Sequence, residues 1–169
     1  FFTVNGAPTK KQTVTILPAQ LSLVPLLGLE SEDGAAQAEL VIENTGWKRV
    51  SGHQIKDVAA WQKERLNFLV SDFQFTTAGS QAGYPNANAV RFKINNASPF
   101  GYKEVDFYVG LYQDQSLSGV IPVKVSNLNS LEIRDIDLRS FVPTLFANQI
   151  KIYPNINLYD SSIYLPPPV

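Results

Sequence analysis

The 169-residue chain contains no cysteine and no methionine. Without cysteine it can form no disulfide bond, no thiolate metal site and no thiol nucleophile. Its single histidine, His53, excludes a zinc site built from two or three histidines and leaves a Ser-His-Asp triad only if His53 serves it. Because His53 lies in the short polar segment 51–54, we expect it to be an exposed loop residue.

Charge is also scarce, at 17% of residues, and the net charge is −1. Seven basic and eight acidic residues precede position 86, and seven of each follow it. Neither half has the excess of Lys and Arg that binding to a nucleic-acid backbone requires, so no nucleic-acid partner is expected. The apolar share of 44% is sufficient for a folded core, which argues against disorder.

No long hydrophobic run is present. The longest apolar stretch, 21–29, is interrupted by Ser22, Pro25 and Gly28, whereas a membrane-spanning helix needs ~20 apolar residues. We therefore expect no transmembrane segment in this chain. Because the chain starts with Phe1 rather than Met, we expect a processed protein that has lost a signal or anchor segment and is extracellular or on the cell surface.

The second half alternates apolar and polar residues with a period of two, which is typical of half-buried β-strands. Turn-forming clusters at 95–101 and 113–116 separate the predicted strands. Pro122 predicts that its strand lies at a sheet edge or that the proline stands where strand pairing starts. In 131–138 the apolar residues change from odd positions (Leu131, Ile133) to even positions (Ile136, Leu138). This one-residue shift predicts a β-bulge at Arg134 and Asp135. The expected core comprises Val105, Phe107, Val109, Leu111, Ile121, Val123, Ile136, Leu138, Ile150 and Ile152.

The first half is less regular. Residues 13–17 are rich in β-branched side chains and predict a strand, and 38–43 predict a second one. Residues 57–69 are the one helix candidate, with Asp57 as its cap. Residues 76–89 carry no charge and many small residues, which favours a surface loop.

These patterns predict an all-β protein with an immunoglobulin-like antiparallel β-sandwich, or two packed sandwich units, and at most one short helix. The expected segments are an extended N-terminal segment over 1–17, a first β-rich region over 18–75, a linker over 76–89, the sandwich over 90–165 and a Pro-rich tail over 166–169.

The segments 95–102 (NNASPFGY) and 105–112 (VDFYVGLY) resemble the FxLYD group of immunoglobulin-like domains. In that group an Asn-rich turn precedes a strand ending in an aromatic residue, a Leu and a Tyr. In this chain Val109 stands in place of the Phe of the FxLYD signature, and Gln113 stands in place of its Asp. Segments 131–134 and 152–157 look like those of predicted bacterial surface proteins that carry two such domains behind a membrane anchor. The resemblance covers about residues 88–165 and implies a fold and an extracytoplasmic location, without a known ligand.

Acidic side chains are the remaining candidates for metal binding or acid–base chemistry. Asp135 and Asp137 share one predicted strand face, and paired carboxylates can bind Ca²⁺ or act as acid and base. The interleaved Arg134 and Arg139 instead favour ion pairs on a solvated face. The other carboxylates considered are Glu132, Asp160, Asp114 and Asp33. None has the spacing of a calcium loop, so we predict no metal, no cofactor and no catalytic residue.

Two further features concern partners. Asn96 begins the only N-x-S/T triplet, which either accepts a glycan or simply forms a turn. Tyr108 and Tyr112 fall on the outward register of their strand, and exposed tyrosines are frequent in contact surfaces with proteins and glycans. They are therefore a candidate binding face.

The N-terminal segment 1–17 combines large apolar residues with strand-like composition at a chain end, where fraying is normal. We predict that it packs on another copy of the chain, as a strand lent to a neighbour's sheet edge. The alternative is a local strand on its own sheet. The predicted contact residues are Phe1, Phe2, Val4, Val14 and Ile16.

Three functions are therefore considered. The first is a non-enzymatic structural subunit of an extracellular assembly, such as a pilus-like filament or surface layer, held by strand exchange. The second is a membrane-anchored immunoglobulin-like surface domain that binds a protein or glycan partner. The third and least favoured is an enzyme, such as a glycosidase accessory unit.

Overall fold

The computed structural model describes residues 1–18, 20–28, 37–43, 45–49, 51, 53–80, 86–141 and 146–166. The chain separates into two compact units. The N-terminal unit comprises residues 1–16 and 24–56, and the sandwich unit comprises residues 17–23 and 57–169.

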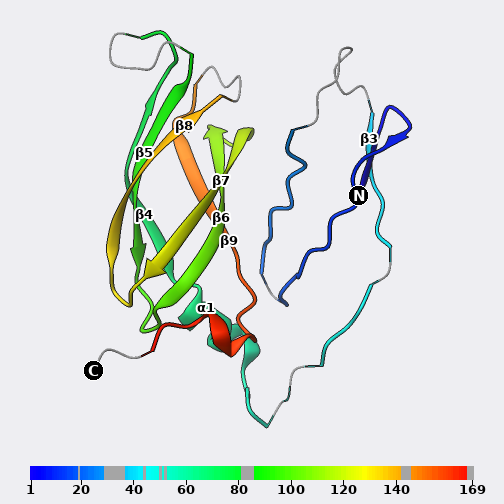
Figure 1. The fold of residues 1–169 in the computed structure, drawn as a ribbon, viewed down its shortest axis with the longest axis vertical. Coiled ribbons are helices and arrows are strands. Elements are labelled where there is room, and N and C mark those ends of the chain that lie inside the picture. Colours follow the sequence, from blue (N-terminus) through cyan, green and yellow to red (C-terminus); the bar gives the residue numbers. More distant parts are fainter. Residues whose placement is uncertain are drawn as a thin grey trace. The chain divides into compact units, whose positions relative to one another are not determined.

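The sandwich unit contains two three-stranded antiparallel sheets, with strand orders β4-β5-β8 and β7-β6-β9 (Figure 1). The hairpins β4–β5 and β6–β7 lie in different sheets, β8 returns beside β5, and β9 returns beside β6. The two sheets form an all-β, sandwich-like fold, which confirms the predicted antiparallel β-sandwich. The strands are β4 (Phe68–Thr76), β5 (Asn88–Asn96), β6 (Tyr102–Gln113), β7 (Ser116–Leu128), β8 (Ile133–Ser140) and β9 (Gln149–Asn155).

The core of the sandwich lies where the alternating pattern placed it. Val105, Phe107, Val109 and Leu111 of β6 are at most 1% exposed, because successive side chains of a strand point to opposite faces and these four share the inner one. Ile121 and Val123 of β7 are also buried, and the other predicted core residues pack against this cluster while partly buried. The predicted core is therefore confirmed.

The β6–β7 hairpin and the sheet edge also follow the prediction. Strand β6 ends at Gln113 and β7 begins at Ser116, with Asp114 at a positive φ of 55° in the turn. Asp tolerates this left-handed conformation better than most residues. Strand β7, which contains Pro122, is an edge strand of its sheet, so the missing N–H of that proline disrupts no central ladder.

The predicted bulge at Arg134 and Asp135 is wrong. Strand β8 pairs with β5 without a register shift from Ile133 to Ser140. The apolar frame slips because Leu131 lies in the preceding turn, at φ 58°, and because Leu131 and Ile133 are exposed. The register shifts of this unit lie elsewhere, between Ser71 and Gln74 and between Leu111 and Tyr112.

The predicted helix forms but is shorter than expected. Helix α1 spans Val58–Arg65, and the Asp57 carboxylate caps it by accepting a hydrogen bond from the Ala60 N–H at 2.9 Å. It ends before Leu69 because residues from Phe68 onward pair with β5. A short 3-10 helix, η1 (Ser161–Ile163), follows β9. Among the described residues no helix has the length and apolar character to cross a lipid bilayer.

The N-terminal unit differs from what was expected. Its described residues form one small antiparallel sheet, with order β2-β1-β3, and not a second sandwich. The strand predicted over 13–17 is not formed, and the strand predicted over 38–43 is limited to three residues. The strands are β1 (Phe2–Val4), β2 (Ala7–Pro8) and β3 (Ala38–Leu40).

The expected boundary between the two halves is also displaced. Residues 76–89 were predicted to link two regions, but they connect β4 to β5 within one sheet, and 88–89 already belong to β5. The sandwich unit instead begins its main segment at Asp57. The reason is that the apolar strand β4 pairs with β5 rather than with the first half of the chain. Residues 81–85 of the predicted linker and 167–169 of the predicted tail lie outside the described residues.

Candidate functional site

The predicted tyrosine pair lies on the outer side of the β7-β6-β9 sheet. Strand register places Tyr108 of β6 opposite Pro122 of β7 on one side and Tyr153 of β9 on the other. Gly110, two residues farther along β6, is on the same face and opposite Lys151 of β9. The outer surface of this sheet is therefore built from side chains of all three strands.

Gly110 allows the rings to lie on the sheet. A Cβ atom at position 110 would stand 2.9 Å from Tyr112 Cε2, 3.2 Å from Leu117 Cδ1 and 3.3 Å from Tyr153 Cε2. These side chains thus occupy the space that any other residue would need. Rings that cover a strand glycine shield its backbone from water.

The two rings above Gly110 are held together. The hydroxyl oxygens of Tyr112 and Tyr153 are 2.6 Å apart in a hydrogen bond, and the Lys151 ammonium lies 4.8 Å from the Tyr112 ring centroid. Burial, followed by the hydrogen bond with Tyr112, raises the pKa of Tyr153 to about 12. The Tyr153 phenol therefore stays neutral at physiological pH.

The prediction that both tyrosines point to solvent needs correction. Tyr112 lies on the outer side but is only 8% exposed, since Tyr153, Leu117 and Lys151 surround it, and Tyr108 is half-buried. The prediction did not name Leu117, which reaches this face from the hairpin partner β7. It also missed Lys151 and Tyr153, because the pairing of β9 with β6 could not be deduced from the alternating pattern alone. We call the surface made by Tyr108, Tyr112, Leu117, Lys151 and Tyr153 the tyrosine face.

Ion pairs lie on other parts of the outer surface of both sheets. Farther along the β7-β6-β9 sheet, Lys124 lies 2.6 Å from Glu104 and 3.5 Å from Asp106. On the β4-β5-β8 sheet, Asp137 of β8 forms a cross-strand ion pair with Arg91 of β5 at 2.9 Å. The prediction had based such pairs on Arg134 and Arg139, and Arg134 pairs with Glu132 instead. A further pair on that sheet joins Lys93 to Asp72 at 2.7 Å. The tyrosine face is thus an uncharged area, apart from Lys151, beside ion-paired ones.

The other acidic candidates have structural partners. Asp114 accepts a hydrogen bond from the Asn148 side chain at 2.8 Å, and Asp160 accepts one from the Ser162 N–H at 2.9 Å. Glu132 pairs with Arg134, whose guanidinium also donates to the Ser126 carbonyl of β7 at 2.6 Å. No group of three metal-ligating side chains occurs in the part of the chain that the structure describes. Asp33 lies outside it.

Asn96 and His53 have different surroundings. The Asn96 side chain is fully buried, and its amide nitrogen donates to the carbonyls of Phe100 at 2.7 Å and Asn129 at 2.8 Å. The Ser98 hydroxyl donates to the Asn96 side-chain oxygen at 2.7 Å. The triplet therefore fixes a turn and offers no accessible acceptor in the folded protein. His53 lies in an exposed turn, as predicted.

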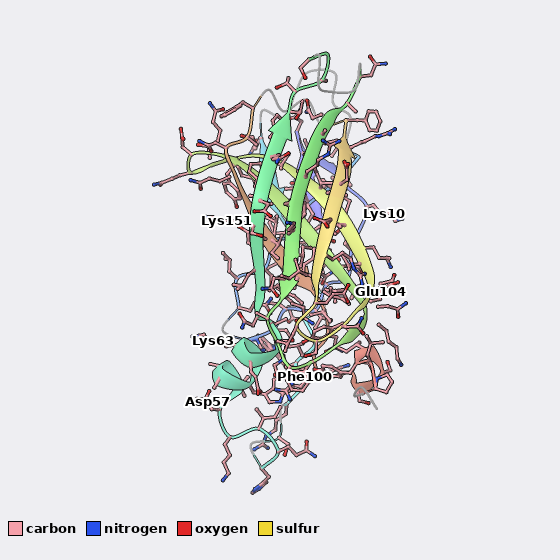
Figure 2. All side chains as sticks on the ribbon, turned by 90° about the vertical axis from the view of Figure 1, so that its left-hand side faces the viewer. Lys10, Asp57, Lys63, Phe100, Glu104 and Lys151 are labelled. Carbon is pink, nitrogen blue, oxygen red and sulfur yellow. The ribbon has the colours of Figure 1, made fainter. Side chains whose placement is uncertain are left out.

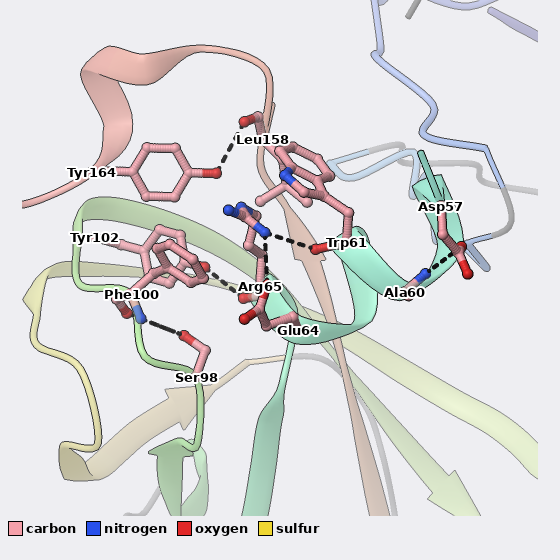
Figure 3. A network of polar contacts seen from close by, with 10 residues as sticks. All are labelled: Asp57, Ala60, Trp61, Glu64, Arg65, Ser98, Phe100, Tyr102, Leu158 and Tyr164. Atoms are coloured by element: carbon pink, nitrogen blue, oxygen red, sulfur yellow. Dashed lines mark hydrogen bonds and ion pairs between the residues drawn. The ribbon is translucent and has the colours of Figure 1, made fainter. Parts of the chain in front are cut away.

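A second aromatic cluster closes one end of the sandwich (Figure 3). The Arg65 guanidinium carbon lies 4.3 Å from the Trp61 ring centroid and 4.1 Å from that of Phe100. The Tyr102 hydroxyl donates to the Arg65 carbonyl at 2.5 Å, and Trp61 stacks on Tyr159 at 5.1 Å. Figure 2 shows Phe100 at the same end as helix α1. The cluster thus attaches this helix to the sandwich.

The predicted donor residues separate into two groups. Phe1, Phe2 and Val4 are half-buried in the N-terminal unit, where β1 pairs with β2 and β3 of its own chain. Val14 and Ile16 are 43% and 65% exposed and lie outside any strand. The structure therefore does not bring these five residues together in one strand.

Comparisons with protein-family models, with curated proteins and with solved structures gave no match.

Proposed function

We propose that this chain is a non-enzymatic, extracellular surface module that binds a protein or glycan partner through the tyrosine face. The observation that carries the proposal is the grouping of three tyrosines, a leucine that is 47% exposed and a lysine around Gly110. Tyrosine supplies a rigid ring and a polar hydroxyl at a low cost in conformational entropy. The face therefore combines contact area with hydrogen-bonding groups.

The contrast with the opposite sheet supports this choice. The outer side of β4-β5-β8 carries the ion pairs Arg91–Asp137 and Lys93–Asp72, and such exposed pairs are typical of solvated surfaces. The central part of a contact surface is instead poor in charge and rich in aromatic side chains. Of the two outer surfaces, the tyrosine face has the composition of a contact area.

The absence of enzymatic activity belongs to the same proposal. Four of the candidate carboxylates, Asp114, Asp160, Asp137 and Glu132, are occupied in turns or ion pairs. A general base must reach the proton it removes, whereas these groups bind other parts of the fold. Their arrangement therefore supports a structural role.

The test is a binding screen of the purified chain against arrayed glycans and arrayed extracellular protein fragments. We expect the double variant Tyr108→Ser, Leu117→Ser to lose at least tenfold in affinity for whatever the wild-type chain binds. The matched control is Arg91→Gln on the opposite sheet, which should bind as the wild type does. Equal loss in the control, or no loss in the double variant, would contradict the assignment of this face.

A second function is favoured by a separate observation. Val14 and Ile16 are exposed in a segment without secondary structure, so a self-assembling subunit of a filament or surface layer is also proposed. The candidate donor is narrower than first expected, because Phe2–Val4 already pair within their own chain. Sedimentation over a range of concentrations, with negative-stain images, tests this function, and a strictly monomeric chain would exclude it.

A further inference from the structure

The four sheet edges of the sandwich differ in how well they are protected from another strand. The β4 edge is interrupted by a register shift, with Asp72 at a positive φ of 55°. The β7 edge contains Pro122, and the β9 edge contains Pro154. Bulges and prolines are ordinary means of preventing edge-to-edge pairing. Strand β8 has neither.

Strand β8 is regular along its whole length of eight residues. Just before it, the Asn96 N–H donates to the Glu132 carbonyl at 2.9 Å. From this bond and the strand register, the β8 residues whose backbone groups bond to β5 are those at even positions. In an antiparallel ladder these residues alternate. The backbone groups of Ile133, Asp135 and Asp137 consequently point away from β5, toward the open side of the sheet.

The inner side of β8 also has apolar surface left to cover. Ile136 and Leu138 pack against the core but remain partly exposed, unlike Phe92 and Val90 opposite them on β5, which are buried. A further strand beside β8 would place its own inward side chains next to these two residues. Apolar side chains at alternate positions are needed for that purpose.

Segment 12–16 has this pattern. Val14 and Ile16 alternate with Thr13 and Thr15, and β-branched residues of this kind favour strands. The segment forms no strand in its own chain, and its side chains are exposed.

We propose that the β8 edge of one copy accepts segment 12–16 of a second copy as an added strand. The added strand extends the β4-β5-β8 sheet and places Val14 and Ile16 beside Ile136 and Leu138. This inference rests on the self-assembly named above and specifies the surface that carries it.

The absence of cysteine makes a cross-linking test direct. Chains carrying Thr15→Cys are mixed with mass-tagged chains carrying Asp135→Cys or Asp137→Cys and oxidised, and the joined residues are identified by mass spectrometry. The matched control pairs Thr15→Cys with Lys124→Cys, which is equally exposed but lies on the proline-containing edge strand β7. We expect at least tenfold more mixed dimer with a β8 cysteine than with the control. Equal yields would overturn the proposal.

The results also distinguish self-assembly itself from the β8 edge as the site of self-assembly. If the wild-type chains associate but the β8 cysteine variants give no more mixed dimer than the control, self-assembly stands and the β8 edge is refuted as its site. Wild-type chains that remain monomeric at all concentrations would refute both. A doubly substituted chain, Thr15→Cys with Asp135→Cys, that cross-links within itself as a monomer would show that the strand is added in the same chain, contrary to the proposal.

Discussion

The sandwich unit and the N-terminal unit treat their apolar side chains in opposite ways. Strand β6 runs for twelve residues, and its inward side chains face a second sheet. Strands β1 and β3 are three residues long and belong to a single small sheet, and Leu40, Ile42 and Trp47 of that unit are exposed. A sheet face is buried only when another layer covers it. The number of layers, rather than the presence of apolar residues, therefore decides where a core forms.

The strongest test of this contrast removes one large ring from each unit. Phe107→Ala should lower the free energy of unfolding by about 3–5 kcal/mol, because Phe107 is fully buried and packs edge-on against Phe68 at 5.1 Å. Trp47→Ala, at a position 94% exposed, should change it by less than about 0.5 kcal/mol. Urea unfolding followed by far-UV circular dichroism measures both. Similar losses in the two variants would mean that the N-terminal unit buries more than its structure indicates.

The next effect concerns buried polar groups, which the sandwich unit contains at the turn before β6. Asn96→Ala should cost about 2–3 kcal/mol, because it leaves the carbonyls of Phe100 and Asn129 without the donor they use. Asn95→Ala, next in the chain and half-buried, serves as the control and should cost about 1 kcal/mol or less. Urea titration measures the free energy of unfolding of both variants. An equal loss at both positions would show that the Asn96 amide is not a main support of the turn.

Glycines permit a comparison of local crowding between the units. Gly110→Ala should destabilise the protein by about 1–2 kcal/mol, since the new Cβ would displace the rings of Tyr112 and Tyr153. Gly46→Ala, in the N-terminal unit, meets no atom within 4 Å and should be close to neutral. Thermal unfolding of the two variants, with near-UV circular dichroism to follow the tyrosines, provides the measurement. An unchanged near-UV spectrum in Gly110→Ala would contradict the placement of the rings over this glycine.

The smallest effect concerns the end cluster. Tyr102→Phe should cost about 1 kcal/mol at neutral pH through the lost hydrogen bond to the Arg65 carbonyl. Burial raises the pKa of Tyr102 from 10.0 to about 12. Because the folded pKa is the higher one, the neutral phenol stabilises the fold below pH ~10, and that contribution is lost as the pH rises toward ~12.

The variant lacks this titrating group. Its free energy of unfolding should therefore fall less steeply between about pH 10 and pH 12 than that of the wild type, as measured by urea titrations at several pH values. Tyr159→Phe, at an exposed tyrosine, should retain the wild-type slope. Parallel curves for wild type and Tyr102→Phe would contradict the raised pKa.

Local patterns in the sequence were sufficient for much of the sandwich. The inward residues of β6 and β7, the hairpin at Asp114 and the Asp57 cap each depend on a few neighbouring residues, and each was predicted. The end of α1 was not, because β4 begins where its pairing with β5 begins. The bulge assigned to Arg134 failed for a similar reason: an exposed Ile133 imitates a shift in register.

The candidate site was predicted only in part. Tyr108 and Tyr112 were identified from the alternation along one strand, but Tyr153 and Lys151 reach the same face from β9, some forty residues later. Periodicity carries no information about which distant strands become neighbours. The burial of Tyr112 follows from that pairing and from the absence of a side chain at Gly110, so a single strand could not reveal it.

The pairing of β8 with β5 and of β9 with β6 also affects how the chain reaches this fold. The hairpins β4–β5 and β6–β7 join neighbouring segments, but Asn88 pairs with Ser140 and Asp106 pairs with Asn155. Long loops must close before such contacts form, and chains dominated by them fold in milliseconds to seconds rather than microseconds. The two hairpins are therefore expected to exist early, with their inner faces exposed, and β8 and β9 are the strands that complete the sandwich during this slow interval.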